Sequence, residues 1–306
     1  LSPSASIGMA LFPDHDSDLS ALIVYADAAM YQAKSDGGNC WRLYSSSPQE
    51  MQCVQEHIQW EGRLRRALEN DQFLLFYQPL LCLSDGTTPG YEALLRMEDR
   101  DGQIISPGLF MESAGRFGLA LPIDYMVIRK AVRKLHSLDE QNLWISLNLS
   151  RASLEDEKLF GHIQEAVEES ALRPGQLHIE ITAAAAMEHV GRVRELGMKL
   201  KTIGCRLVLD DFGHGPADQF LQQIPVDMVK IDASLIRDLR THKTNQALVK
   251  GLTSVAHDLG IQVVAKFVED VALIDLLREL NVDYAQGFAI GRPMESIELM
   301  RSIDQV

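Results

Sequence analysis

The sequence predicts an α/β protein in which a small N-terminal α/β fragment precedes a TIM-like (β/α)8 barrel. Eight short apolar strands alternate with amphipathic helical segments, and polar residues recur where these strands end. The length of 306 residues suits a barrel of about 250 residues plus an appendage.

The N-terminal 70 residues are expected to form a small unit and a linker helix. A strand at residues 4–12, a helix at 18–35 and a short return strand at 41–44 are separated by turn signals, of which Asp36-Gly37-Gly38-Asn39 is the strongest. Ser45-Ser46-Ser47-Pro48 opens a helix that ends near residue 70. We therefore divide the chain into residues 1–45, 46–70 and 71–306.

The barrel itself is expected to begin at the apolar run that follows residue 73. Its eight strands are predicted at residues 74–78, 90–96, 143–149, 177–182, 206–210, 228–232, 262–265 and 284–287. Amphipathic helical segments are predicted at residues 160–171, 190–203, 245–259 and 271–280. Asp85-Gly86 lies between the first two strands at hairpin distance, which predicts one antiparallel strand in the barrel.

Composition and charge exclude several classes of protein. A formal charge of −14 argues against binding a nucleic acid polymer through a basic face. No run of 18 apolar residues and no signal peptide are visible, so we expect no membrane contact within this chain. The four cysteines contain no C-x-x-C pair and read as free thiols. We expect a cytoplasmic location, and a membrane-anchored full-length parent protein stays open.

A cluster of polar residues at the predicted strand ends is the main functional signal. The acidic and amide members are Glu92, Asn148, Glu180, Asp210, Asp211, Asp232 and Gln286. Lys230 and Lys266 lie among them. Carboxylate and amide oxygens suit Mg²⁺, Mn²⁺ or Ca²⁺. The residue types leave one alternative open, an internal salt-bridge cluster in which the two lysines neutralise the carboxylates without a metal.

These residues belong to a series of motifs in a specific order. The motifs are Tyr77-Gln78-Pro79, Glu92-Ala93-Leu94-Leu95-Arg96, Ser146-Leu147-Asn148-Leu149-Ser150, Ile179-Glu180-Ile181-Thr182, Leu209-Asp210-Asp211-Phe212-Gly213, Val229-Lys230-Ile231-Asp232, Tyr284-Ala285-Gln286-Gly287-Phe288 and Gly291-Arg292-Pro293-Met294. Over roughly residues 59–300 the chain resembles the EAL family, which hydrolyses the bacterial second messenger cyclic di-GMP. Residues 1–45 resemble the C-terminal part of a GGDEF domain, the diguanylate cyclase fold, without its signature segment.

The resemblance implies a role for each matching residue. In similar enzymes two divalent cations activate a water that attacks phosphorus and gives the linear dinucleotide pGpG. Positions that match metal ligands are Glu92, Asn148, Glu180, Asp210 and Asp211. Lys230 matches a catalytic lysine, and Arg96 matches the arginine that contacts the ligand phosphate. Gln78, Asp232, Gln286 and Pro293 are further expected ligand contacts.

Three departures from the family pattern put catalysis in doubt. The pattern Ala-Glu-Gly-Val-Glu reads Ala265-Lys266-Phe267-Val268-Glu269, so a glutamate becomes a lysine. We expect the Lys266 ammonium either to replace a metal between Asp210 and Glu180 or to swing out to solvent. Ala183 replaces a glutamate expected to anchor the loop after the fifth strand. His214 in that loop is either a new base or ligand or simply exposed.

We therefore expect a degenerate EAL domain without effective phosphodiesterase activity. It is expected to act as a cyclic di-GMP receptor or a protein-interaction module, with Mg²⁺ or Mn²⁺ bound weakly or not at all. The alternative is an active, metal-dependent cyclic di-GMP phosphodiesterase. A homodimer and an unidentified downstream protein partner follow from family analogy alone.

Overall fold

The computed structural model describes residues 5–36, 38–138, 143–213 and 221–297 of the chain. Two compact units are present, the first formed by Leu1–Asn70 with Gly108–Leu119 and the second by Asp71–Pro107 with Ala120–Val306. Residues 108–119 thus group with the N-terminal residues. The assignment of residues 1–45 to a GGDEF-like fragment remains a prediction.

The first unit contains a two-stranded parallel sheet and helices that pack with it. Its elements are β1 (Ile7–Met9), α1 (Leu19–Ser35), β2 (Trp41–Leu43), α2 (Pro48–Glu69) and α3 (Met111–Arg116). Asp18 caps α1 by accepting a hydrogen bond from the backbone of Ala21, and Ser47 with Glu50 forms a capping box at the start of α2. The predicted helices are confirmed. The first strand is shorter than predicted because its ladder to β2 pairs only three residues.

The second unit is a closed barrel of eight strands. They are β3 (Phe73–Cys82), β4 (Gly90–Glu98), β6 (Trp144–Asn148), β7 (Leu177–Thr182), β8 (Arg206–Phe212), β9 (Met228–Ile231), β10 (Gln262–Ala265) and β11 (Tyr284–Ala285). The order β3-β11-β10-β9-β8-β7-β6-β4 closes through pairing of β3 with β4, and the short β5 (Ile104–Ile105) extends β4 at its end. This confirms the predicted TIM-like fold.

Strand β3 is antiparallel to both of its neighbours, whereas the remaining neighbours in the closed ring run parallel. The hairpin from β3 to β4 turns at Asp85, whose carboxylate accepts hydrogen bonds from the backbone and hydroxyl of Thr87. Gly86 follows with a φ of 73°, a left-handed conformation that glycine adopts without a Cβ clash. The predicted antiparallel strand is therefore confirmed, with its physical cause in this turn.

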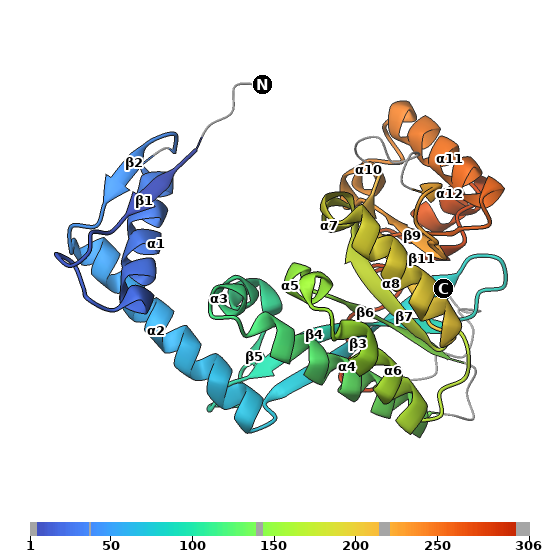
Figure 1. Cartoon of the computed structure of the whole chain (residues 1–306). Helices are drawn as coiled ribbons and strands as arrows, with labels where there is room; N and C mark the ends of the chain where they lie inside the picture. Colours follow the sequence, from blue (N-terminus) through green and yellow to red (C-terminus); the bar gives the residue numbers. More distant parts are fainter. Residues whose placement is uncertain (1–4, 37, 139–142, 214–220, 298–306) are drawn as a thin grey trace. The chain divides into compact units, whose positions relative to one another are not determined.

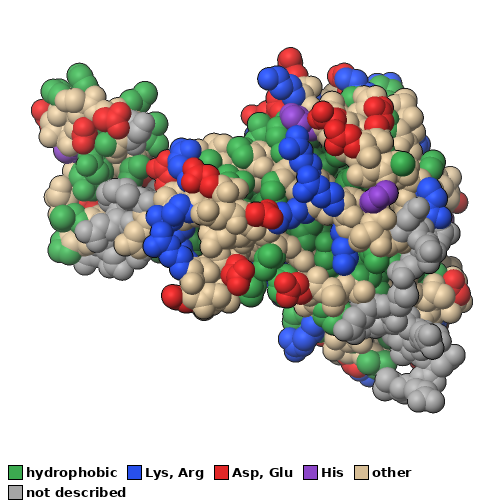
Figure 2. Space-filling view, turned by 90° about the horizontal axis from the view of Figure 1, so that it is seen from below, with side chains coloured by type: hydrophobic (Ala, Val, Ile, Leu, Met, Phe, Trp, Pro, Cys, Tyr) green, Lys and Arg blue, Asp and Glu red, His purple; other side chains and the backbone are tan. Residues whose placement is uncertain are grey.

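Helices cover the outside of the barrel (Figure 1). They are α4 (Ala120–Ser137), α5 (Arg151–Glu155), α6 (Leu159–Glu169), α7 (Ala183–Glu188), α8 (Val190–Thr202), α10 (Ala233–Arg237), α11 (Lys243–Asp258) and α12 (Leu273–Glu279). The four predicted helical segments correspond to α6, α8, α11 and α12, with ends shifted by one to two residues. No helix in the described ranges is long and apolar enough to span a bilayer. Acidic and basic side chains are interspersed on the face shown in Figure 2.

An apolar layer closes the barrel toward the amino-terminal ends of its parallel strands. Its buried members are Leu80, Trp144, Val208, Met228 and Val264. Trp144 fits because Gly90 beside it has no side chain: a Cβ there would lie 2.1 Å from the indole. The indole stacks on His178 at 4.2 Å between ring centroids, and burial lowers the pKa of that histidine to about 3. His178 is therefore a neutral polar residue within this layer, and the charged side chains of the barrel interior discussed below lie toward the opposite, carboxyl end.

Candidate ligand pocket and ion-pair network

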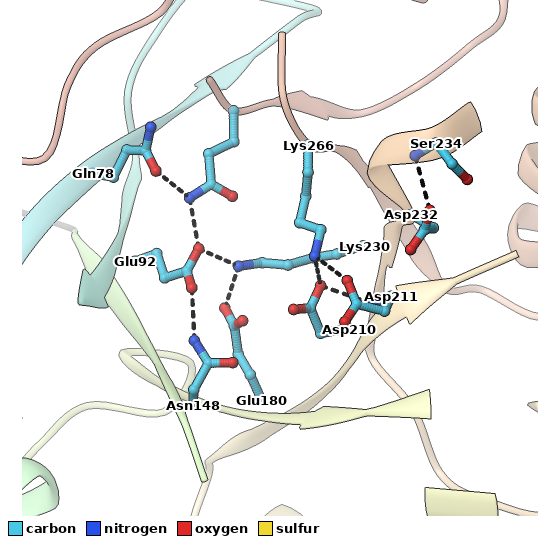
Figure 3. A network of polar contacts seen from close by, with 11 residues as sticks. Gln78, Glu92, Asn148, Glu180, Asp210, Asp211, Lys230, Asp232, Ser234 and Lys266 are labelled. Carbon is cyan, nitrogen blue, oxygen red and sulfur yellow. Dashed lines mark hydrogen bonds and ion pairs between the residues drawn. The ribbon is translucent and has the colours of Figure 1, made fainter. Parts of the chain in front are cut away.

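The polar residues singled out in the sequence converge at the carboxyl end of the barrel (Figure 3). Asn148 ends β6, Lys230 lies in β9, and Lys266 directly follows β10. The expectation that Glu92 lies at a strand end is wrong. Glu92 is the third residue of β4 and pairs with Gln78 of β3, because the long hairpin carries β4 on to Glu98. Glu92 is therefore placed deeper inside the barrel than the residues at the strand ends.

The inner half of the site is a buried network around Glu92. The Lys230 ammonium lies 2.7 Å from Oε2 of Glu92, and the amides of Asn148 and Gln286 donate to the same carboxylate at 2.7 and 2.6 Å. Gln286 also donates to Oε1 of Gln78. Burial opposes ionisation of Glu92, yet the charge of Lys230 and these hydrogen bonds hold its pKa below the ordinary value. Glu92 is thus an ionised carboxylate with three polar contacts, from Lys230, Asn148 and Gln286.

The Glu180 carboxylate accepts fewer hydrogen bonds than the Glu92 carboxylate does. Its carboxylate is fully buried and lies 2.6 Å from the Lys230 ammonium, which it shares with Glu92. Within the described part of the chain, neither of its oxygens accepts a well-directed hydrogen bond. Burial and the neighbouring charge of Glu92 raise the pKa of Glu180 to about 7. The same two carboxylates raise the pKa of Lys230 against the effect of burial, so the ammonium keeps its proton.

The outer half of the site is an ion-pair triad of Lys266, Asp210 and Asp211. The Lys266 ammonium lies 2.5 Å from Oδ1 of Asp210 and 2.6 Å from Oδ1 of Asp211. Its side chain is 11% exposed, so the alternative of a solvent-directed lysine is wrong. The expected bridge to Glu180 is also wrong, because Lys230 holds that carboxylate. Burial would lower the pKa of Lys266, but the two aspartates raise it above the ordinary value.

A break in the regular strand explains how two consecutive aspartates meet one ammonium. Successive side chains of a strand point to opposite faces. Here the pairing of β8 with β9 shifts between Leu209 and Phe212, and Asp211 adopts a φ of 53°. Such an irregularity re-aims the side chain that it carries. Both carboxylates of the Asp210-Asp211 pair therefore face the barrel mouth.

A cavity of about 340 Å³ opens beside this network. Among the residues that line it are Gln78, Arg96, Lys266, Gln286, Phe288 and Pro293. The Arg96 guanidinium donates to the backbone oxygen of Leu95 and lies 5.6 Å from the ring centroid of Phe76. Burial lowers the pKa of Arg96, and no carboxylate pairs with it among the described residues. Asp232 instead caps α10 by accepting from the backbone of Ser234.

Known proteins share the sequence pattern and the barrel of this chain. The sequence profile of the EAL domain matches residues 61–293. This chain belongs to the EAL domain family. It is 36% identical over 294 residues to the cyclic di-GMP phosphodiesterase PdeB of Shewanella oneidensis, covering 94% of this chain and 34% of that protein. The chain thus spans about a third of the length of this relative.

Two solved structures share the barrel of this EAL domain. The FimX EAL domain from Pseudomonas aeruginosa bound to c-di-GMP has a TM-score of 0.74 at 29% identity, covering 78% of this chain and 98% of that one. The PaMucR phosphodiesterase in its c-di-GMP complex has a TM-score of 0.73 at 32% identity, covering 77% and 97%. The likeness thus extends over nearly the whole of both neighbours.

The residues present in this EAL domain do not fit a centre of two divalent cations. The carboxylates of Glu92, Glu180, Asp210 and Asp211 face two ammonium groups, which leaves a formal charge of −2, or −1 when Glu180 is protonated. The Lys266 ammonium contacts one oxygen of each aspartate, so the chain itself supplies the positive charge that a cation would otherwise bring to this pair. Within the described ranges, no group of three or more Asp, Glu, His or Cys side chains is arranged to hold a metal.

Sequence reasoning missed the aromatic side chains of the EAL pocket. Phe267 and Phe288 both line the cavity, and their exposed fractions are 42% and 53%. Their positions in the sequence are the signal that could have found them, since Phe267 directly follows Lys266 and Phe288 lies two residues after Gln286. Ala183 begins α7, which Thr182 caps from its hydroxyl. His214 lies outside the described residues.

Proposed function

We propose that this EAL domain is a receptor that binds cyclic di-GMP without divalent cations and does not hydrolyse it effectively. The ammonium of Lys266 between the oxygens of Asp210 and Asp211 carries this proposal. A tethered ammonium supplies the positive charge that a cation would otherwise bring to the aspartate pair. Unlike a metal ion, it has no open coordination position that could hold and activate a water.

The loss of hydrolysis follows from the groups that remain. The glutamate of the family pattern is absent at position 266, so one carboxylate that would accept a proton from water is missing. Lys230 is fully buried and committed to Glu92 and Glu180. Lys230 bridges the two glutamates, so these three groups carry a net charge of −1, or zero when Glu180 is protonated, and the ammonium is held by its two partners.

Ligand contact is proposed to centre on Arg96. Its planar guanidinium lies at the cavity, and a fork of N–H donors matches the geometry of a phosphate. Gln78, Gln286 and Pro293 line the same cavity. The c-di-GMP complexes of the FimX EAL domain and PaMucR support a ligand of this chemistry. We propose that Asp232, which caps α10, contributes by holding the adjacent segment rather than by direct contact.

Calorimetric titration with cyclic di-GMP tests the proposal, in parallel with chromatography of the nucleotide products. We expect saturable binding in excess chelator and no pGpG after prolonged incubation with Mg²⁺ or Mn²⁺. Arg96→Ala should abolish most of the affinity, whereas Arg129→Ala on the exposed face of α4 should leave it unchanged. Turnover to pGpG would instead favour the active phosphodiesterase. No binding under either condition would favour a protein-interaction module.

Signal output is proposed to pass to a partner protein. A receptor without turnover acts only through ligand-dependent contacts, which require a second molecule, either a copy of this chain or a different protein. Light scattering with and without cyclic di-GMP tests the homodimer. A ligand-independent monomer would leave an unrelated protein as the partner.

A further inference from the structure

Phe267 occupies a backbone position that normally belongs to glycine. Its φ is 57°, in the left-handed region, and the EAL pattern quoted above has glycine at this place. A bulky aromatic residue is a conformational outlier there, since its Cβ crowds the backbone. Strain of this kind gathers at functional sites when the surrounding structure holds it in place. The exchange of glycine for phenylalanine accompanies the exchange of glutamate for Lys266.

The backbone around Phe267 is held on its C-terminal side. The N–H of Val268 donates to the oxygen of Gln286 at 3.0 Å, and the N–H of Ala289 donates to the oxygen of Val268 at 3.0 Å. The two segments approach closely because Gly287 has no side chain: a Cβ there would lie 2.2 Å from the oxygen of Val268. These contacts hold the backbone that follows Phe267 in place beside the cavity.

The ring itself is positioned by a cation. The Arg237 guanidinium lies 5.0 Å from the ring centroid of Phe267, which remains 42% exposed and lines the same cavity as Arg96 and Lys266. Phe288 on the same cavity has a similar partner, since the Arg292 guanidinium lies 4.6 Å from its ring. The cavity therefore combines cations suited to phosphate with flat apolar surfaces suited to a base.

We propose that Phe267 is a stacking platform for one guanine of the cyclic dinucleotide, and so a specificity-determining residue. This inference rests on the proposed function. A guanine base offers a broad π-face, and an aromatic ring whose backbone is fixed before binding loses little freedom when the base stacks on it. On this inference, the strained backbone at Phe267 is tolerated because the position gains an aromatic ring for the base, which glycine would lack.

Titration of Phe267 variants with cyclic di-GMP in chelator tests the inference. Phe267→Leu keeps an apolar side chain but removes the ring, and Phe267→Gly removes the ring while restoring the residue that this backbone favours. We expect both to bind about 5- to 150-fold more weakly, the range for losing one base–aromatic stack. Phe267→Trp keeps a ring and should retain affinity. Circular dichroism melts verify that each variant is folded.

A spectroscopic readout separates stacking from a general loss of shape. In the wild type, the H8 proton signal of one guanine should move upfield on binding, because the base lies over an aromatic ring. Phe267→Leu should remove that displacement at saturating protein. Suppose the wild type binds, and the leucine and glycine variants bind with the same affinity and give the same H8 displacement as the wild type. That result would overturn this inference and leave the proposed function standing. Absence of wild-type binding would overturn the proposed function together with it.

Discussion

Replacing Lys266 by glutamate is the perturbation that best separates a receptor from an enzyme. In the wild type the ammonium lies 2.5 Å from Asp210 and 2.6 Å from Asp211. Lys266→Glu changes the formal charge of the site by two units, from −2 to −4. That value balances two divalent cations, whereas −2 balances one. We therefore expect the variant to bind Mg²⁺ or Mn²⁺ far more tightly than the wild type.

The size of the effect follows from Coulomb's law. Two unit charges about 4 Å apart interact by about 4 kcal/mol at an effective dielectric constant of about 20, and a divalent ion doubles this to about 8 kcal/mol. Asp211 is 51% exposed, so solvent screens much of that repulsion. If only a quarter survives, about 2 kcal/mol remains, which corresponds to roughly 30-fold in the dissociation constant of the metal.

Thermal melts with increasing Mn²⁺, supported by calorimetry, measure this difference. A cation at about 100 times its dissociation constant stabilises the folded state by about 2.7 kcal/mol, or roughly 5 to 10 °C for a domain of this size. The matched control is Lys199→Glu on α8. Lys199 lies 2.6 Å from Glu195, but this pair is half exposed on α8 and is not among the residues that line the cavity. The same change in charge there should leave the metal response unchanged.

The nucleotide products of the same variant extend the test. Lys266→Glu should recover pGpG formation only in part, because Ala183 still replaces a family glutamate, and adding Ala183→Glu should recover more. Two cations bound to the wild type at micromolar concentration, or equal Mn²⁺ responses of wild type and Lys266→Glu, would refute the reasoning. So would wild-type turnover with Mn²⁺ at ordinary enzyme rates, of order 1 s⁻¹.

Three further outcomes are expected from the same structure. Arg96→Ala should weaken cyclic di-GMP binding in chelator by about 2–3 kcal/mol, and unchanged affinity in calorimetry would place the phosphate elsewhere. The pKa of Glu180 is about 7 in the folded protein against an ordinary 4.5, so its contribution to stability is present below about pH 4.5 and is lost as the pH rises through 7. Glu180→Gln should therefore flatten the fall in melting temperature between about pH 5 and pH 8; an unaltered slope contradicts this. Gly287→Ala should destabilise the fold by about 1–3 kcal/mol in denaturant unfolding, because the added Cβ lies 2.2 Å from the backbone of Val268.

The sequence predicts the barrel well because its signals are local and repeated. Each strand is a short apolar run with its own turn, and Asp85-Gly86 indicates the antiparallel hairpin that the structure confirms. The 18-residue helix α4 is missed by the prediction, although its buried residues recur at helical spacing. Helices α5, α7 and α10 escape prediction because five or six residues make fewer than two turns and show no helical period. Their presence depends on caps and on packing against the barrel instead.

The sequence predicts which residues form the site better than it predicts how they are arranged. The strand-end rule brings Asn148, Glu180, Asp210 and Lys230 together correctly. It misplaces Glu92, whose depth depends on the length of the β3–β4 hairpin, a property of two strands jointly. It also gives Lys266 one wrong partner. The turn of Asp211 toward the barrel mouth depends on an irregular pairing of β8 with β9, which no residue of the Asp-Asp pair indicates.

The two lysines of this pocket are not equivalent, and their difference explains why one exchange changes the function we propose. Lys230 is fully buried and compensates carboxylates that would otherwise be buried without a partner, so its removal should chiefly harm folding. Lys266 compensates aspartates at the cavity, where a mobile cation could do the same. Because the Lys266 ammonium is covalently attached to the chain, its positive charge stays beside the aspartates whatever the metal concentration. On the proposed function, a pocket so arranged gains a constant electrostatic state for ligand binding, and it gives up the open coordination position that metal-dependent hydrolysis needs.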